Sequence, residues 1–252
     1  ISESAAGILL VVMGILAMFR NKAKKGWKIS AIIVSAVFAV VAVLLCSMTV
    51  YPAGISTWMR DNMMHAGNVS EAETSESTVA DGSRLLSDVQ YDDQVPNGYM
   101  DIYYSASPLG DNPVTAIFLH GGGYIWGDKA NGDPNAGGTT FEDSTCAALL
   151  AHGYNVVQMN YCLMPEYPYP EAILQLNRGL KYLYEHADEL SLNMDAVVIG
   201  GASAGGNLAG VLVNLQTNPD YAAQLGTEAS VPEGTVRAAF FEGGCLTIPS
   251  TG

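Results

Sequence analysis

Residues 196–206 read Ala196-Val-Val-Ile-Gly-Gly-Ala-Ser203-Ala-Gly-Gly206, an apolar run that ends in small residues around a single serine. The β-branched run predicts a buried strand, and the segment from about Ala204 to Gln216 predicts a helix directly after it. Gly201 and Gly205 let strand and helix pass closely. The sequence therefore predicts a tight turn that holds the hydroxyl of Ser203 in the open.

This G-x-S-x-G pattern is weak when taken alone, because glycine and serine are common residues. A glycine-rich turn that binds phosphate is the structural alternative. Neither G-x-G-x-x-G nor a lysine of the Walker type is present at the turn, which disfavours a nucleotide site. The pattern gains weight only from a second glycine-rich segment.

That second segment is His120-Gly121-Gly122-Gly123, which directly follows a predicted strand at 114–119. Consecutive glycines leave bare backbone amides that can point at one oxygen, as an acyl-transfer site needs where negative charge develops. We expect the amides of Gly122 and Gly123, with that of Ala204, to form an oxyanion hole. His120 precedes the sharp turn, and we expect it to brace the loop by hydrogen bonding rather than to act as a base.

The remaining periodicity alternates between short apolar runs and helical patterns from about residue 85 onward. This alternation predicts a mainly parallel, doubly wound α/β sheet. The further expected strands are 100–104, 155–160 and 236–241, and the further expected helices are 140–152 and 171–190.

With these motifs in place, residues from about 85 to the end resemble the α/β-hydrolase fold, specifically the hormone-sensitive-lipase-like esterases. A third match lies between the two glycine motifs, where residues 161–170 (YCLMPEYPYP) are close to the family's Y-R-L-A-P-E-x-x-x-P. Cys162 stands in place of the usual arginine, and Ala202 stands where aspartate is common. The resemblance implies hydrolysis of carboxylic esters of small or medium acyl groups, with Ser203 as nucleophile.

Two alternatives stay open: a serine peptidase of the same fold, and a non-catalytic module for binding or adhesion. Expected substrates are small-molecule or acylated-carbohydrate esters. We expect no cofactor, because acyl-enzyme chemistry needs none, and no metal, because no ligand spacing for a metal is present. Cys146, Cys162 and Cys245 are an odd set, which favours buried free thiols over a disulfide framework.

The catalytic histidine has no candidate after Ser203. For the catalytic acid, none of the acidic residues that follow the serine sits in a motif that marks it: Asp220, Glu228, Glu233 and Glu242. In this fold the order is serine, then Asp or Glu, then histidine, yet His65, His120, His152 and His186 all precede Ser203. We therefore expect residues 85–252 to be a truncated hydrolase domain, and the chain alone to be nearly inactive.

The charges of the chain are divided unevenly. The formal charge is −14, from 11 basic and 25 acidic residues, and five of the basic residues lie within 20–28. From residue 51 onward 6 basic and 24 acidic residues give 6 − 24 = −18. This balance excludes a nucleic-acid binder that relies on a basic surface.

The basic cluster separates two uncharged runs, residues 5–19 and 29–50. The second spans about 33 Å as a helix, enough to cross a bilayer. We predict a transmembrane hairpin over residues 1–50 that contacts membrane lipid, rather than a buried helix, a signal peptide or a lipoprotein signal at Cys46. By the positive-inside rule its basic turn is cytoplasmic, so the hydrolase domain is extracytoplasmic.

Residues 51–84 are expected to be a flexible acidic stalk. The segment 67–78 is rich in Ser, Thr and Glu and almost without large apolar residues. Such a segment buries too little surface to offset its ordering entropy.

Overall fold

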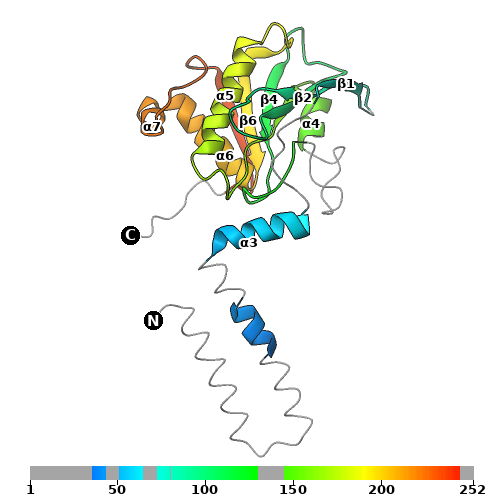
Figure 1. Cartoon of the computed structure of the whole chain (residues 1–252). Helices are drawn as coiled ribbons and strands as arrows, with labels where there is room; N and C mark the ends of the chain where they lie inside the picture. Colours follow the sequence, from blue (N-terminus) through cyan, green and yellow to red (C-terminus); the bar gives the residue numbers. More distant parts are fainter. Residues whose placement is uncertain (1–35, 44–50, 65–72, 80, 130–144, 245–252) are drawn as a thin grey trace, which may run out of the picture. The chain divides into compact units, whose positions relative to one another are not determined.

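The computed structural model describes residues 36–43, 51–64, 73–79, 81–129 and 145–244 (Figure 1). The chain divides into two compact units, Ile1–Trp58 and Met59–Gly252. The second unit carries the sheet and both glycine-rich motifs.

Within the described residues, seven strands form one sheet in the order β1-β2-β3-β5-β4-β6-β7. Their bounds are β1 Ser75–Thr78, β2 Arg84–Gln90, β3 Tyr99–Tyr104, β4 Val114–Leu119, β5 Asn155–Met159, β6 Asn193–Ala202 and β7 Val236–Glu242. The pairs β5–β4, β4–β6 and β6–β7 are parallel, whereas β1, β2 and β3 join by antiparallel pairing. The predicted parallel α/β pairing is confirmed where the two motifs lie, and the antiparallel strands β1, β2 and β3 make the whole sheet mixed.

Helices cover both faces of the sheet, as Figure 1 shows. The bounds are α3 Pro52–Met59, the π-helix η1 Arg60–Met64, α4 Thr145–Ala151, α5 Glu171–Glu185, α6 Ala204–Thr217 and α7 Pro219–Gln224. Alternation along β4 separates two apolar clusters: Ile117 and Leu119 pack with α5, α6 and α7, whereas Ala116 and Phe118 pack with α4. Successive side chains of β4 thus point to opposite faces of the sheet, and both faces are buried by helices, as expected for a sheet between two helical layers.

The carboxyl end of β4 is a topological switch point. The chain leaves β4 through α4 to β5 on one side, and later returns through α5 to β6 on the other. Because these two connections cover opposite faces, the loops that follow β4 and β6 lie at the place where open α/β sheets bind ligands. The predicted glycine loop and serine turn are those two loops.

Most predicted elements are confirmed within three residues at each end, with one clear exception. The helix predicted over 171–190 ends at Glu185, and residues 186–191 form turns. The apolar pattern continues because Ala187 and Leu190 still pack on the core. The apolar spacing in the sequence therefore continues past the last residue of the helix. Of the helix predicted over 140–152, residues 140–144 lie outside the described residues.

The segment predicted as a flexible stalk contains regular structure where it is described. Residues 52–64 form α3 and η1, and β1 pairs with β2 in antiparallel register from Ser75↔Ser87 to Thr78↔Arg84. Composition underestimates such a strand, because backbone hydrogen bonds to a neighbour need no apolar side chains. Residues 65–72 lie outside the described part.

The predicted membrane helix 5–19, and most of 29–50, also lie outside the described residues. Residues 36–43 are helical. In the described part of the chain, no helix has both the length and the apolar character needed to span a bilayer.

Candidate active site

Ser203 occupies a strained turn between β6 and α6. Its backbone has φ +50° and ψ −115°, which is unusual for a residue with a side chain, and its side chain does not cap α6. The turn is held by the backbone: Ser203 N–H donates to the carbonyl oxygen of Glu242 at 2.8 Å, and Asn207 N–H donates to the carbonyl oxygen of Ser203 at 3.1 Å. The serine is exposed, although Ala202 before it is half-buried and Ala204 after it is buried. The turn thus presents one hydroxyl at the switch point.

Glycine is required on both sides of this turn. A Cβ at Gly201 would lie 2.6 Å from the carbonyl oxygen of Leu119, and a Cβ at Gly205 would overlap the carbonyl oxygens of Leu119 and His120. The end of β4, the end of β6 and the start of α6 therefore meet backbone to backbone. This close approach is the structural reason for the G-x-S-x-G pattern.

The triple-glycine loop lies directly against Ser203. A Cβ at Gly121 would lie 3.1 Å from the carbonyl oxygen of Ala202 and 3.4 Å from Cβ of Ser203. Gly122 has φ +122°, and its carbonyl oxygen accepts hydrogen bonds from Ile125 N–H and Trp126 N–H, both at 3.1 Å. The structure therefore brings together the two motifs, which are about 80 residues apart in the sequence.

His120 makes its side-chain hydrogen bond within its own loop. Its Nδ1 lies 2.7 Å from the carbonyl oxygen of Gly121, and its Nε2 is buried with no partner among the described residues. A carbonyl only accepts, so Nδ1 carries the proton and Nε2 is bare. Burial lowers the pKa of His120 and keeps the ring neutral. Neither ring nitrogen bonds Ser203, in keeping with the expectation that His120 supports the loop.

Residues 161–170, here called the Tyr-Pro segment, pack against the glycine loop and are hydrogen-bonded to it. The hydroxyl of Tyr161 donates to the carbonyl oxygen of His120 at 2.9 Å, and their rings stack with centroids 4.3 Å apart. Met164 N–H donates to the carbonyl oxygen of Tyr124 at 2.8 Å. The third motif therefore contacts the first directly.

Comparison with known proteins fits this geometry. A family profile described as BD-FAE matches residues 100–239, more than half of the chain. The chain belongs to the BD-FAE family. An AB hydrolase superfamily protein of Schizosaccharomyces pombe is 35% identical over 109 residues, covering 43% of this chain and 29% of the relative. An acetyl esterase of Salmonella paratyphi B is 35% identical over 120 residues, covering 46% of this chain and 33% of the relative.

Solved structures agree on the fold of this BD-FAE chain. Esterase B from Lactobacillus rhamnosis superposes with a TM-score of 0.54 at 23% identity, covering 66% of this chain and 49% of that one. An inhibited form of esterase B gives a TM-score of 0.55 at 20% identity, covering 81% and 57%. The predicted membership of the esterase-like α/β-hydrolases is confirmed. The chain spans about a third of the length of the curated relatives it matches, the AB hydrolase superfamily protein and the acetyl esterase.

Several buried polar residues of the BD-FAE domain carry no sequence motif and were not predicted. Lys129 Nζ lies 2.8 Å from Asp88 and 3.0 Å from Asp101. Asn160 binds Asp128 and the backbone of Lys129. These residues fix the far end of the glycine loop. The one sequence feature that could have indicated them is the Gly-Asp-Lys run directly after Trp126.

Two bidentate ion pairs tie further segments to this domain. The guanidinium of Arg60 binds the carboxylate of Glu166, with N–O distances of 2.6 and 2.9 Å, and this hydrogen bond raises the pKa of Arg60 and lowers that of Glu166. Arg178 binds Asp92 in the same manner, at 2.8 and 2.9 Å. The first pair joins η1, in the segment predicted as a stalk, to the Tyr-Pro segment.

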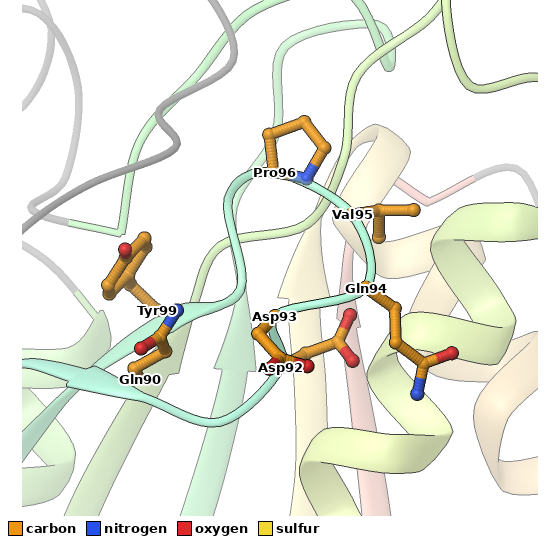
Figure 2. Close-up of a pocket in the computed structure, with 7 residues that line it drawn as sticks. All are labelled: Gln90, Asp92, Asp93, Gln94, Val95, Pro96 and Tyr99. Carbon is orange, nitrogen blue, oxygen red and sulfur yellow. The ribbon is translucent and has the colours of Figure 1, made fainter.

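A cavity of about 200 Å³ lies at the connection between β2 and β3, away from the two motifs (Figure 2). Its lining residues are Gln90, Asp92, Asp93, Gln94, Val95, Pro96 and Tyr99. Asp92 is already paired with Arg178. The cavity includes no predicted site residue, so we assign it no part in the chemistry.

The two cysteines within the described residues are buried, and the hydroxyl of Tyr124 is hydrogen-bonded. Cys146 and Cys162 are buried and free, and burial raises the pKa of the Cys162 thiol to about 12. Cys245 lies outside the described residues. The Tyr124 hydroxyl donates to Asn207 Oδ1 at 2.9 Å, which joins the glycine loop to α6. Among the described residues, no group of three or more His, Cys, Asp or Glu is arranged to hold a metal ion.

Proposed function

We propose that this chain carries the nucleophile and oxyanion hole of a serine hydrolase that cleaves carboxylic esters through an acyl-enzyme. The observation that carries this proposal is the exposed Ser203 at φ +50°, with the triple-glycine loop against it. Backbone strain of this kind persists where the surroundings enforce it, and it concentrates at functional sites. An elbow and a glycine loop at one switch point favour an enzyme over a binding module.

The reaction would proceed in two displacements. Ser203 Oγ attacks the carbonyl carbon of the ester, and its proton passes to a general base. The tetrahedral intermediate then collapses, the C–O bond to the alcohol breaks, and the proton goes to that alcohol as it leaves. Water repeats the sequence on the acyl-enzyme, which releases the acid and restores the hydroxyl.

The hydrogen bonds of the loop support Gly122 and Gly123 as oxyanion donors. In a trans peptide the C=O and the following N–H point in opposite directions. The carbonyl of Gly121 points to His120, and that of Gly122 points to the turn at Ile125 and Trp126. The N–H groups of Gly122 and Gly123 therefore point away from these internal partners and stay available to a ligand. The amide of Ala204, at the start of α6, is the third proposed donor.

The general base is proposed to be a histidine that follows Ser203 in the full-length protein. His120, the histidine of the glycine loop, forms its hydrogen bond through Nδ1 to the carbonyl oxygen of Gly121, and neither of its ring nitrogens bonds Ser203. A full-length sequence that has no histidine after Ser203 would contradict the esterase proposal directly.

For the substrate we propose an ester with a small acyl group, such as acetate. The support is the 35% identity to an acetyl esterase over 120 residues. An acylated carbohydrate is a substrate of this kind. The test is hydrolysis of p-nitrophenyl acetate by the full-length protein, compared with a peptide p-nitroanilide. Faster cleavage of the anilide would favour the peptidase alternative.

The matched control for Ser203→Ala is Ser191→Ala. Both serines are exposed and have positive φ, +50° and +52°, and they lie at opposite ends of β6. Loss of hydrolysis in the first variant, with retention in the second, separates chemistry from backbone strain. Equal activity in the two variants would reject Ser203 as nucleophile.

We further propose that residues 1–50 anchor the protein in a membrane as a helical hairpin, with the hydrolase domain outside the cytoplasm. Supporting this, helical residues 36–43 expose large apolar side chains on every side, at Val37, Phe38, Val40, Val41 and Val43. A helix that is apolar all round is typical of burial in lipid or protein. An antibody to the domain should bind intact cells, and binding only after permeabilisation would overturn this orientation.

A further inference from the structure

Asn160 is the first residue after β5, and its side chain closes the far end of the glycine loop. Its Oδ1 accepts from the backbone N–H of Lys129 at 2.5 Å, and its Nδ2 donates to Asp128 Oδ2 at 3.0 Å. The residue is only 4% exposed. An amide that both accepts and donates fits this pair of partners, and no other side chain of its size does both.

The backbone of Asn160 is fixed as firmly as its side chain. Its N–H donates to the carbonyl oxygen of Tyr99 at 3.0 Å, and its carbonyl oxygen accepts from the hydroxyl of Tyr91 at 2.6 Å. The backbone of Asn160 is thus anchored in the sheet, while its side chain is hydrogen-bonded to residues 128 and 129. Asn160 cannot shift without breaking bonds in β3 or at Tyr91.

The loop between its two fixed ends is short and rich in glycine. The first end is held by Tyr161 and His120, and the second by Asn160. Between them lie Gly121, Gly122, Gly123 and Gly127, which supply little stiffness of their own. The positions of the proposed oxyanion donors therefore depend on where the two ends are held.

We propose that Asn160 is a positioning residue for the oxyanion loop and sets the placement of the Gly122 and Gly123 amides relative to Ser203. This inference rests on the proposed esterase function. Oxyanion donors act mainly on the transition state, so misplacing them lowers kcat more than it raises KM. Because a smaller folded fraction would also lower the apparent kcat at constant KM, kcat is expressed per folded enzyme molecule.

The test exchanges the donor and acceptor roles of one pair. Asn160→Asp keeps the shape and the acceptor for Lys129 N–H, but it faces the carboxylate of Asp128 with a second carboxylate. Asp128→Asn alone keeps an oxygen that can accept from Asn160. In the double variant, the amide introduced at 128 can donate to the carboxylate introduced at 160. We expect rescue in the double variant.

In the full-length protein we expect Asn160→Asp to lower kcat for p-nitrophenyl acetate roughly 10- to 100-fold, since small misplacements at a reacting centre cost about this much. KM should stay within about twofold, as is expected when only transition-state contacts are lost. Asp128→Asn should stay close to wild type, and the double variant should recover most of the loss. An unchanged kcat in Asn160→Asp, or a double variant no better than that single one, would overturn the proposal.

Hydrogen exchange of the peptide covering 120–129 provides a readout that does not need catalysis. Asn160→Asp should speed exchange in this peptide, with little change in the peptide covering α5, and the double variant should reverse the change. Uniformly faster exchange across the domain would overturn the positioning role in favour of a general stabilising one. An inactive wild type would reject the esterase function, while exchange would still decide the role of Asn160 in holding the loop.

Discussion

The hydroxyl of Tyr161 donates a hydrogen bond to the carbonyl oxygen of His120, 2.9 Å away, while the two rings stack at an interplanar angle of 10°. Both side chains are buried. A single tyrosine thus contacts the base of the glycine loop through its edge and its face. The Tyr-Pro segment and the glycine loop therefore form one packed unit, although they come from different strands.

The Tyr161→Phe variant should separate these two contacts. It retains the stack but leaves a buried carbonyl without this donor, which costs about 1–2 kcal/mol of unfolding free energy. Urea unfolding measures the change. Tyr154→Phe, a half-buried tyrosine on the opposite face of the sheet, is the control and should cost less than about 0.5 kcal/mol. Equal losses in the two variants would contradict the assigned bond.

Lys129 should be the most sensitive charge in the domain. Its ammonium is buried between Asp88 and Asp101, and the Asp101 side chain is 4% exposed. Lys129→Met leaves buried carboxylates without their cation, and we expect a loss of about 3–5 kcal/mol in urea unfolding. Lys181→Met removes an exposed pair with Glu185 and should cost no more than about 0.5 kcal/mol.

The Lys129→Met defect should also depend on pH. Burial raises the pKa of Asp101 in the folded protein. A carboxyl whose folded pKa lies above its unfolded value takes up a proton on folding, so its protonation favours the folded state as the pH falls. The deficit of Lys129→Met should therefore shrink between pH 7 and pH 5. A deficit that grows over this range would contradict a buried, uncompensated carboxylate.

His120 should contribute the opposite pH dependence. Burial lowers its folded pKa below the ordinary 6.5. Below pH 6.5 the unfolded chain binds a proton that the folded chain does not, so the unfolding free energy should fall as the pH drops. His120→Asn keeps a donor for the Gly121 carbonyl, and it should flatten this slope in urea unfolding at pH 7.5 and 5.5. If the unfolding free energy of His120→Asn fell as steeply with pH as that of the wild type, the group responsible would be a residue other than His120.

The parts of the site that could be predicted from the sequence are those specified by local backbone geometry. A close approach that excludes a Cβ requires glycine whatever surrounds it, so Gly201 and Gly205 were identifiable next to Ser203. The strands could be predicted for a similar reason, because burial on two faces requires continuous apolar runs such as 114–119.

The parts that could not be predicted depend on pairs of residues far apart in the sequence. Lys129 and Asp101 are 28 residues apart, and Arg60 and Glu166 are 106 apart. Their pairing follows from the tertiary arrangement of strands, loops and η1, which single-residue chemistry does not encode. The sequence indicates Asn160 only as the last residue of a predicted strand. Its role becomes visible once β5 is placed beside β4.

The central claim is that Ser203 is an activated nucleophile facing the triple-glycine loop. The most direct measurement is peptide mass spectrometry of the full-length protein after treatment with an alkyl fluorophosphonate, which phosphonylates only activated serines. We expect one stoichiometric adduct on the peptide containing Ser203, with no adduct in Ser203→Ala and an undiminished adduct in Ser191→Ala. An adduct on another serine, or none in a folded protein that hydrolyses p-nitrophenyl acetate, would contradict it.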